Sequence, residues 1–285
     1  MTVKEIQYAE ETIYGVTPAN ATFKTLGYEP KVMFSFDPRE ITIPQPDSED
    51  RQTIQRGDAS DITWDVVYKP TDTSFAKYGV NSQGGGSGTI DKSLTLLMTV
   101  KLSATTETWI ILRGARSNVT SLKGRAGGDL EVRVTGRSQT MPIPVQADPG
   151  YNYATSSTSI PIQLKDGGIT PVTIAGTSYN VNDIEVVINR NLATIPQPDS
   201  TAPQNLLPQQ RDVDGTFGMT WETLTPLTQF DNLIPTTLIW TLKNSTNTTL
   251  TIGTTILNRL NSITFLPEET LFENYSFEGT TAVLT

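Results

Sequence analysis

The sequence contains no cysteine and no histidine among its 285 residues. Without cysteine, the chain has no disulfide bonds, no thiolate metal ligands and no cysteine nucleophile. Without histidine, it also lacks the commonest general base and the commonest metal ligand of proteins. The Ser-His-Asp and Cys-His forms of nucleophilic catalysis are therefore excluded. We expect no catalytic residue, no cofactor site and no metal site, and hence a protein that is not an enzyme.

Long apolar runs are also missing. No stretch approaches the roughly 18 apolar residues that mark a membrane-spanning helix. The first residues, MTVKEIQYAEETIYG, have no apolar region of the kind found in signal peptides. We therefore expect synthesis in the cytoplasm of the producing cell and no contact with a membrane.

Basic residues are scarce in the second half of the chain. Residues 1–142 contain 16 Lys and Arg against 17 Asp and Glu, a net charge of −1, and residues 143–285 contain 5 against 13, a net charge of −8. The total of −9 argues against tight binding to nucleic-acid phosphates, because like charges repel.

The hydrophobic pattern is that of β-strands. In SLTLLMTVKLS (93–103) every second residue is apolar, and DITWDVVY (61–68), DLEVRVTG (129–136) and DIEVVINR (183–190) alternate in the same way. Helix signals are limited to PTDTSFAKYG (70–79), with a Thr or Asp cap and Gly79 as a stop, and to TPLTQFDNLI (225–234). The pattern predicts a mainly β fold with about one short helix in each half.

The hexapeptide IPQPDS occurs twice, at 43–48 and at 195–200. Further matches follow in the same order: ITWD (62–65) with MTWE (219–222), and then Arg116, Asn118 and Gly136 with Arg259, Asn261 and Gly279. Such an ordered series indicates internal duplication. We predict two tandem homologous β-sandwich or barrel domains at 1–140 and 161–285, joined by a linker or arm at 141–160. Trp64 and Trp221 are predicted to be equivalent core residues, and each IPQPDS copy, with its two prolines, is expected at a strand end or sheet edge.

Two segments of the first half resemble phage tail tube proteins. EETIYGVTPANATFKTLGY (10–28) is similar to the opening of these proteins, and LRGARSNVTSLKGRAGGDLEVRVTG (112–136) is similar to their closing section. The second half has no copy of YGVTP. The resemblance implies β-sandwiches that assemble into rings, whose inner sheets merge into one barrel around a channel, and rings that stack into a tail.

What the resemblance implies for this chain is a structural virion protein of a siphovirus-like tail. Because six domains usually surround the channel, two domains per chain imply a homotrimeric ring. The implied partners are other copies of the chain and other tail proteins (tape measure, tip and terminator). DNA would pass to the host through the channel without specific binding, and we expect a net acidic channel whose charge comes mostly from the second half.

The polar segment 47–61 is interpreted as a long loop or hairpin that reaches the neighbouring ring. The candidate residues for contacts between rings are Asp47, Glu49, Asp50, Arg51, Arg56 and Asp58.

Other readings of the same residues stay open. Arg56-Gly57-Asp58 is a tripeptide that adhesion receptors recognise, and the pairs Glu10-Glu11 and Glu268-Glu269 contain the residue type needed for glycoside hydrolysis. Adjacent acids in a strand point to opposite faces, however. The main alternative to a tube is a non-enzymatic β-sandwich binding module: an adhesin, a capsid decoration or a carbohydrate-binding tandem.

Overall fold

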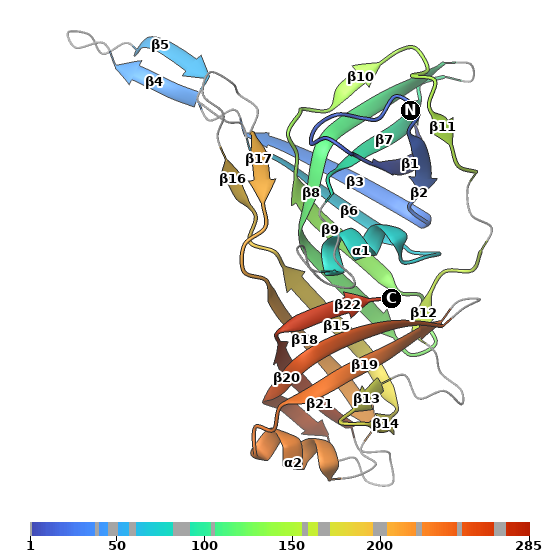
Figure 1. Ribbon diagram of the computed structural model, residues 1–285, viewed down its shortest axis with the longest axis vertical. Coiled ribbons are helices and arrows are strands. Elements are labelled where there is room, and N and C mark those ends of the chain that lie inside the picture. The colour runs from blue at the N-terminus through green and yellow to red at the C-terminus, as the bar shows by residue number, and fades with distance from the viewer. Residues whose placement is uncertain are drawn as a thin grey trace.

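The computed structural model describes residues 2–37, 40–44, 51–56, 61–81, 92–103, 106–155, 159–164, 172–195, 204–220, 224–243, 247–264 and 272–285. The fold is mainly β, as predicted, and one short helix lies in each half of the chain (Figure 1). The helices are α1 (Ser74–Val80) and α2 (Thr225–Asp231). Helix α1 ends at Val80, one residue past Gly79, and Asn81 is its C-cap residue. At the other end, Ser74 N donates a hydrogen bond to the side chain of Asp72 at 2.7 Å, and the Thr73 side chain does not cap the helix.

A large antiparallel sheet runs through both halves and is the structural centre of the molecule. Its eight strands follow one another in the order β3 (Tyr28–Asp37), β6 (Asp61–Lys69), β9 (Glu131–Arg137), β8 (Glu107–Arg125), β15 (Val181–Asn189), β18 (Asp212–Thr220), β21 (Phe272–Gly279) and β20 (Asn247–Thr264). The first four strands belong to the first half and the last four to the second half.

Each half adds a smaller sheet that packs on the large one. In the first half it contains β2 (Thr22–Thr25), β1 (Thr2–Glu10), β7 (Leu94–Lys101), the N-terminal part of β8 and β10 (Ile143–Val145). In the second half it contains β14 (Thr177–Tyr179), β13 (Val172–Ile174), β12 (Gln163–Leu164), β19 (Thr236–Lys243), the N-terminal part of β20 and β22 (Thr281–Leu284). The long strands β8 and β20 therefore bend from one sheet into the other.

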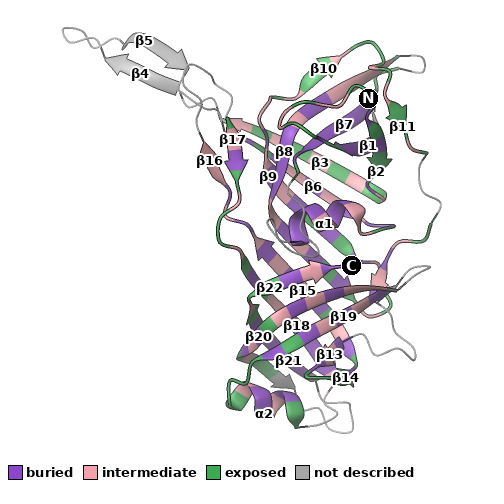
Figure 2. Cartoon of the chain, in the orientation of Figure 1, coloured by how far each residue is buried: buried purple, intermediate pink, exposed green. Residues whose placement is uncertain are grey.

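The core lies between the large sheet and the two smaller ones. Apolar side chains on alternate positions of β6, β9, β15, β18 and β21 form one continuous buried cluster that includes Trp64, Phe217 and Tyr275 (Figure 2). Strand β7 differs from the predicted half-buried alternation, because both of its faces are buried. A second cluster around Phe23 and Leu97 covers the other face, and Tyr151 packs against it.

Much of the predicted linker at 141–160 is built into the first half. Strand β10 pairs with β8, and β11 (Asn152–Tyr153) pairs in parallel with β2. The segment runs along the first half before the chain enters the second, and its role as a linker or arm remains a prediction.

Two hairpins leave the large sheet at corresponding points of the two halves. They are β4 (Glu40–Pro44) with β5 (Arg51–Arg56), and β16 (Ala193–Ile195) with β17 (Asn205–Leu207). The described part of each IPQPDS copy lies at the end of the first strand of a hairpin, as predicted. The β4–β5 hairpin extends away from the body of the molecule, whereas β16–β17 lies along the edge of the first half (Figure 1).

Candidate assembly interface

The seam between the two halves is a ladder of seven residue pairs, from Asp183 opposite Arg125 to Asn189 opposite Val119. On the core side of the seam, Ile188 faces Thr120, and both residues are fully buried. On the other side, Glu185 faces Lys123, with 3.5 Å between Oε2 and Nζ. The seam joins two sheets of four strands by main-chain hydrogen bonds, which makes one surface out of two halves.

The ends of the eight-stranded sheet are open among the described residues. Strand β3 pairs only with β6, and residues 256–264 of β20 pair only with β21. Phe36 and Leu260 lie on these two edges, and both side chains are partly buried against the core. An unpaired edge presents free N–H and C=O groups to any strand that can pair with it.

Strand pairing defines which positions of the two halves correspond. Strand β8 has two bulges and β20 has three, the third at Asn261, and the first bulge of each strand contains a residue of positive φ, Gly114 (66°) and Thr254 (46°). The second bulge lies at Asn118 in β8 and at Asn258 in β20. Aligning the first two bulges relates the strands by 140 residues. The third bulge of β20, at Asn261, lies 143 residues after Asn118, so the correspondence of Arg116, Asn118 and Gly136 with Arg259, Asn261 and Gly279 remains a prediction.

This alignment places the two open edges in the relation already seen at the seam. Thr120 of β8 corresponds to Leu260 of β20, and Ile188 of β15 corresponds to Phe36 of β3. Leu260 and Phe36 on the two open edges therefore have the positions that Thr120 and Ile188 have at the seam.

The face of the large sheet that points away from the core carries charged residues from both halves. In the first half, Arg133, Lys69 and Lys123 are engaged by carboxylates. Arg133 donates hydrogen bonds from Nε and Nη2 to the two carboxylate oxygens of Asp65, with 2.6 Å between Nη2 and Oδ2. Lys69 Nζ lies 3.1 Å from Glu29 Oε2 and 3.5 Å from Asp129 Oδ2. The carboxylate of Asp65 raises the pKa of Arg133.

In the second half the same face is acidic. Asp212, Asp214 and Glu278 lie close together, and Asp214 is directly opposite Glu278 in the ladder. Partial burial raises the pKa of Asp214, and the charges of Glu278 and Asp212 raise it further. Like charges opposite each other weaken a sheet, so this cluster is a local cost to folding.

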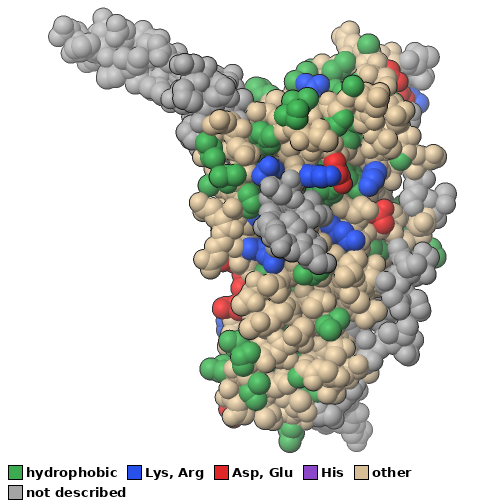
Figure 3. Space-filling view, in the orientation of Figure 1, with side chains coloured by type: hydrophobic (Ala, Val, Ile, Leu, Met, Phe, Trp, Pro, Cys, Tyr) green, Lys and Arg blue, Asp and Glu red, His purple; other side chains and the backbone are tan. Residues whose placement is uncertain are grey.

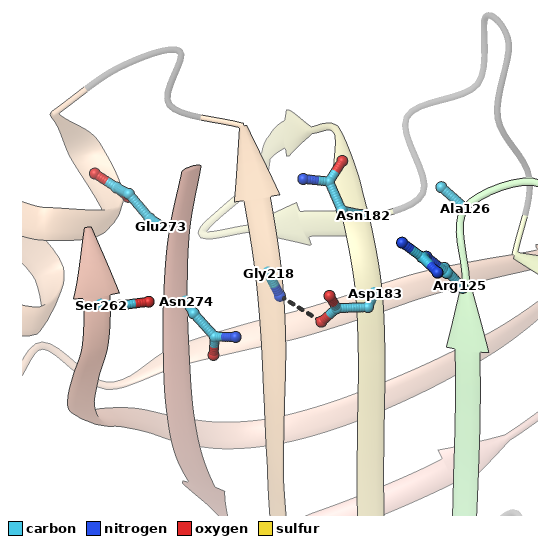
Figure 4. A pocket seen from close by; sticks show the side chains of 8 residues that line it. All are labelled: Arg125, Ala126, Asn182, Asp183, Gly218, Ser262, Glu273 and Asn274. Atoms are coloured by element: carbon cyan, nitrogen blue, oxygen red, sulfur yellow. Dashed lines mark hydrogen bonds between the residues drawn. The ribbon is translucent and has the colours of Figure 1, made fainter. Parts of the chain in front are cut away.

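A polar pocket of about 420 Å³ lies at the other end of this part of the sheet (Figure 4). It crosses the seam, since Arg125 comes from β8, Asp183 from β15 and Asn274 from β21. The Asp183 carboxylate accepts a hydrogen bond from Gly218 N at 3.1 Å. The lining is polar and shallow, and we assign it no ligand.

The opposite side of the molecule has another character. Figure 3 shows the side that carries α1, where Lys and Arg gather near the centre and most other side chains are uncharged.

The predicted contact residues fall mostly outside the described part of the chain. Asp47, Glu49, Asp50 and Asp58 lie outside it. Arg51 and Arg56 are in β5, where their backbones pair with Pro44 and Glu40. The predicted loop 47–61 therefore contains one strand of the β4–β5 hairpin, and the contact between rings remains a prediction.

Of the two predicted core tryptophans, Trp64 is buried in the large sheet and donates a hydrogen bond from Nε1 to Arg137 O at 3.0 Å. Trp221 lies outside the described residues, and its core role remains a prediction. In the strand alignment, Gly215 is the residue of the second half that corresponds to Trp64. There the aromatic ring comes from the neighbouring strand, because Phe277 lies over Gly215 as Trp64 lies over Gly136.

The two sheet edges were not found from the sequence, because an edge is defined by pairing between remote strands. Among the described residues no group of acids could hold a metal ion, and neither helix is long and apolar enough to cross a membrane.

Comparison with known proteins identifies the family. None of the curated proteins compared with the chain matches it. The model of the phage tail tube protein family matches residues 3–281, which include both halves and the seam. The β-rich fold, the tail tube match and the extent of that match together place this chain in the phage tail tube protein family.

Proposed function

We propose that this protein polymerises into stacked rings that form the wall of a phage tail tube, the conduit through which the genome enters the host. The role is structural and not enzymatic. The observation that carries the proposal is the seam between β8 and β15, together with the open edges β3 and β20 in the corresponding positions. In the ring, β3 of one chain pairs with β20 of the next.

Such an interface is head-to-tail, and it closes when the rotation per unit completes a circle. Eight strands alone would close around side chains, whereas barrels of about 16 or more strands leave an aqueous channel. Three chains of eight strands give about 24 strands and six homologous halves around the channel. We therefore favour a homotrimer.

The outward face of the large sheet would line this channel. Of its described cations, Arg133, Lys123 and Lys69 are in ion pairs and Arg125 lies beside Asp183 in the polar pocket, whereas Asp212, Asp214 and Glu278 form an acidic cluster. Paired cations attract phosphates weakly, and the acidic cluster repels them, so DNA can pass without being held. In this arrangement, cations of the first half would share the face with the acids of the second.

The hairpins support the same neighbour relation. Hairpin β16–β17 docks on the first half, where Arg116 Nη1 donates to Leu206 O and Arg137 Nη1 donates to Thr194 Oγ1, both at 2.8 Å. The β4–β5 hairpin has the corresponding place in the first half, so its partner would be another chain. From there the segment 47–61 would reach the neighbouring ring, and the ends of the tube would meet the tape measure, tip and terminator proteins of the tail in the virion.

A cross-linking experiment tests the ring. The chain has no cysteine, so Phe36→Cys with Leu260→Cys introduces only two thiols. Within one chain they lie at opposite ends of an eight-stranded sheet, about 34 Å apart along it at roughly 4.8 Å per strand. A short bifunctional thiol reagent should therefore produce covalent dimers and trimers in assembled material, with rings or tubes in negative-stain images.

The matched control is Thr120→Cys with Ile188→Cys, which should cross-link within a single chain because these residues are ladder partners. Tubes that form without the Phe36–Leu260 cross-link would refute the proposed seam. Rings with a mass of six chains would refute the trimer.

A further inference from the structure

The end of helix α1 is held by the C-terminal strand of the chain. Asn81, which follows α1, accepts a hydrogen bond from Leu284 N at 2.7 Å and donates one from Nδ2 to Leu284 O at 3.2 Å. Arg211 adds a hydrogen bond to Val80 O at 2.6 Å, and Thr73 Oγ1 donates to Thr285 O at 3.4 Å. The first half is thus fastened to strand β22 of the second half through both ends of α1.

Helix α2 has the same construction but no such partner among the described residues. It begins and ends 151 residues after α1, and Asn232 follows α2 as Asn81 follows α1. The side chain of Asn232 is exposed and turns back to its own helix, where Nδ2 donates to Thr228 O at 2.8 Å. Figure 2 shows α1 largely buried and the ends of α2 exposed.

Both ends of α2 carry exposed apolar side chains. Leu224, at the N-terminal end, is 62% exposed, and Leu233 and Ile234, at the C-terminal end, are 58% and 44% exposed. Leu224 corresponds to Thr73, which contacts the C-terminus at the internal interface. Exposed apolar groups at matching ends of a helix mark a surface that another molecule covers.

The counterpart of β22 in the first half is β10. Each pairs with the N-terminal part of the long strand, β22 with β20 and β10 with β8. The alignment by 140 residues places Pro144 of β10 at the position of Leu284. Next to it, Met141 and Ile143 are 42% and 40% exposed.

We infer that α2 of one chain docks on β10 of the next chain, as α1 docks on β22 within the chain. Asn232 Nδ2 donates to the carbonyl of Pro144, and Leu224, Leu233 and Ile234 cover Met141, Ile143 and Val145. This inference rests on the proposed head-to-tail ring and names a second contact in it, away from the strand seam.

Pro144 limits how closely the contact between chains can reproduce the contact between Asn81 and Leu284 within the chain. Proline has no N–H, so only one of the two hydrogen bonds that Asn81 makes with Leu284 can form between Asn232 and Pro144. The apolar side chains at the ends of α2 offset the hydrogen bond that Pro144 cannot donate. At α1 such a side chain is missing, because Thr73 holds the position that corresponds to Leu224. The contact between chains is thus more apolar than the contact within the chain, as suits a surface that forms only on assembly.

The first test is the critical concentration for assembly, measured by sedimentation. Asn232→Ala should raise it about fivefold, as expected for one lost interface hydrogen bond. Leu224→Ser should raise it about tenfold or more by removing apolar contact. In the unassembled chain Leu224→Ser should leave Tm unchanged, and Asn232→Ala should lower it by less than the control below, because it removes only the exposed hydrogen bond to Thr228 O. The matched control is Asn81→Ala, which should lower that Tm by about 4 °C or more because it removes two buried hydrogen bonds inside the chain.

The second test is a cross-link between Asn232→Cys and Pro144→Cys, which should join different chains, with Asn81→Cys and Leu284→Cys as the internal control. If the Phe36–Leu260 cross-link forms but the 232–144 cross-link does not, and Asn232→Ala assembles normally, the docking of α2 is wrong and the ring stands. If neither cross-link between chains forms, the ring itself is wrong.

Discussion

The two halves of this protein share one plan but differ in how completely they are covered. In the first half, β8 is paired by β15, and α1 is fastened by β22. In the second half, the corresponding edge of β20 has no described partner, and the ends of α2 are exposed. Every partner that the first half receives is a part of the second half. This difference supports the proposal that the second half is completed by the first half of another copy.

The cores of the two halves also differ in a way that can be tested. Trp64 lies over Gly136 in the first half, and Phe277 lies over Gly215 in the second, so the aromatic residue and the glycine have exchanged strands. An added Cβ at Gly136 would lie 2.1 Å from Arg116 O, and one at Gly215 would lie 2.3 Å from the Phe277 ring. The glycine makes room for the ring in each half.

The largest effects are expected from removing these rings. Trp64→Ala and Phe277→Ala should each lower the free energy of unfolding by about 3–5 kcal/mol, because each leaves a cavity in the same continuous core. Chemical denaturation of the unassembled chain measures both. A loss below about 1 kcal/mol for either variant would show that the two pairs are not equivalent in energy.

A smaller effect is expected at Glu11, in the N-terminal segment that has no sequence copy in the second half. The buried carboxylate accepts hydrogen bonds from Ser93 Oγ, Thr95 Oγ1, Gly15 N and Gly114 N at 2.5–2.9 Å. Glu11→Gln places an NH₂ group against some of these donors. The free energy of unfolding should fall by about 2–3 kcal/mol, since hydrogen bonds to a charged group are lost.

Thermal unfolding of Glu11→Gln, compared with Glu5→Gln in the preceding strand β1, measures this effect. If the two variants unfold alike, Glu11 does not organise the N-terminal segment.

The sequence predicts those parts of the fold that depend on local pattern. Alternating apolar residues identify β6, β9 and β15, and Pro226 with its neighbours identifies α2. The burial of both faces of β7 is not predictable in this way, because its second face is covered by Tyr151 and Phe23, which are remote in sequence.

The correspondence between the halves shows the same limit. The matching residues Arg116, Asn118 and Gly136 suggest one alignment, whereas the bulges at Gly114 and Thr254 favour another. Non-glycine residues seldom adopt positive φ, so a threonine gives no sign of the bulge in the sequence. The candidate interface was beyond prediction for a related reason: Phe36 and Leu260 are ordinary apolar strand residues, and only the pairing of the sheet places them on its edges.

The smallest predicted effect concerns a residue that differs between the halves. The strand alignment places Glu273 of β21 where the first half has Val132, and both side chains are buried. Burial raises the pKa of Glu273, although the Tyr275 hydroxyl, 2.6 Å from Oε2, lowers it in part. The folded chain therefore favours the protonated carboxyl more than the unfolded chain does.

The sign of the pH effect follows from this raised pKa. Below the usual value of 4.5, Glu273 is protonated in both states and costs nothing. As the pH rises through that value toward the higher value of the folded state, the unfolded chain releases its proton first, and stability falls. Glu273→Gln keeps an acceptor for Tyr275 but does not titrate, so it should raise Tm at pH 7, and the gain should fade as the pH falls below 4.5. A gain in Tm that is the same at both pH values would mean that packing, and not the buried charge, distinguishes this position from Val132.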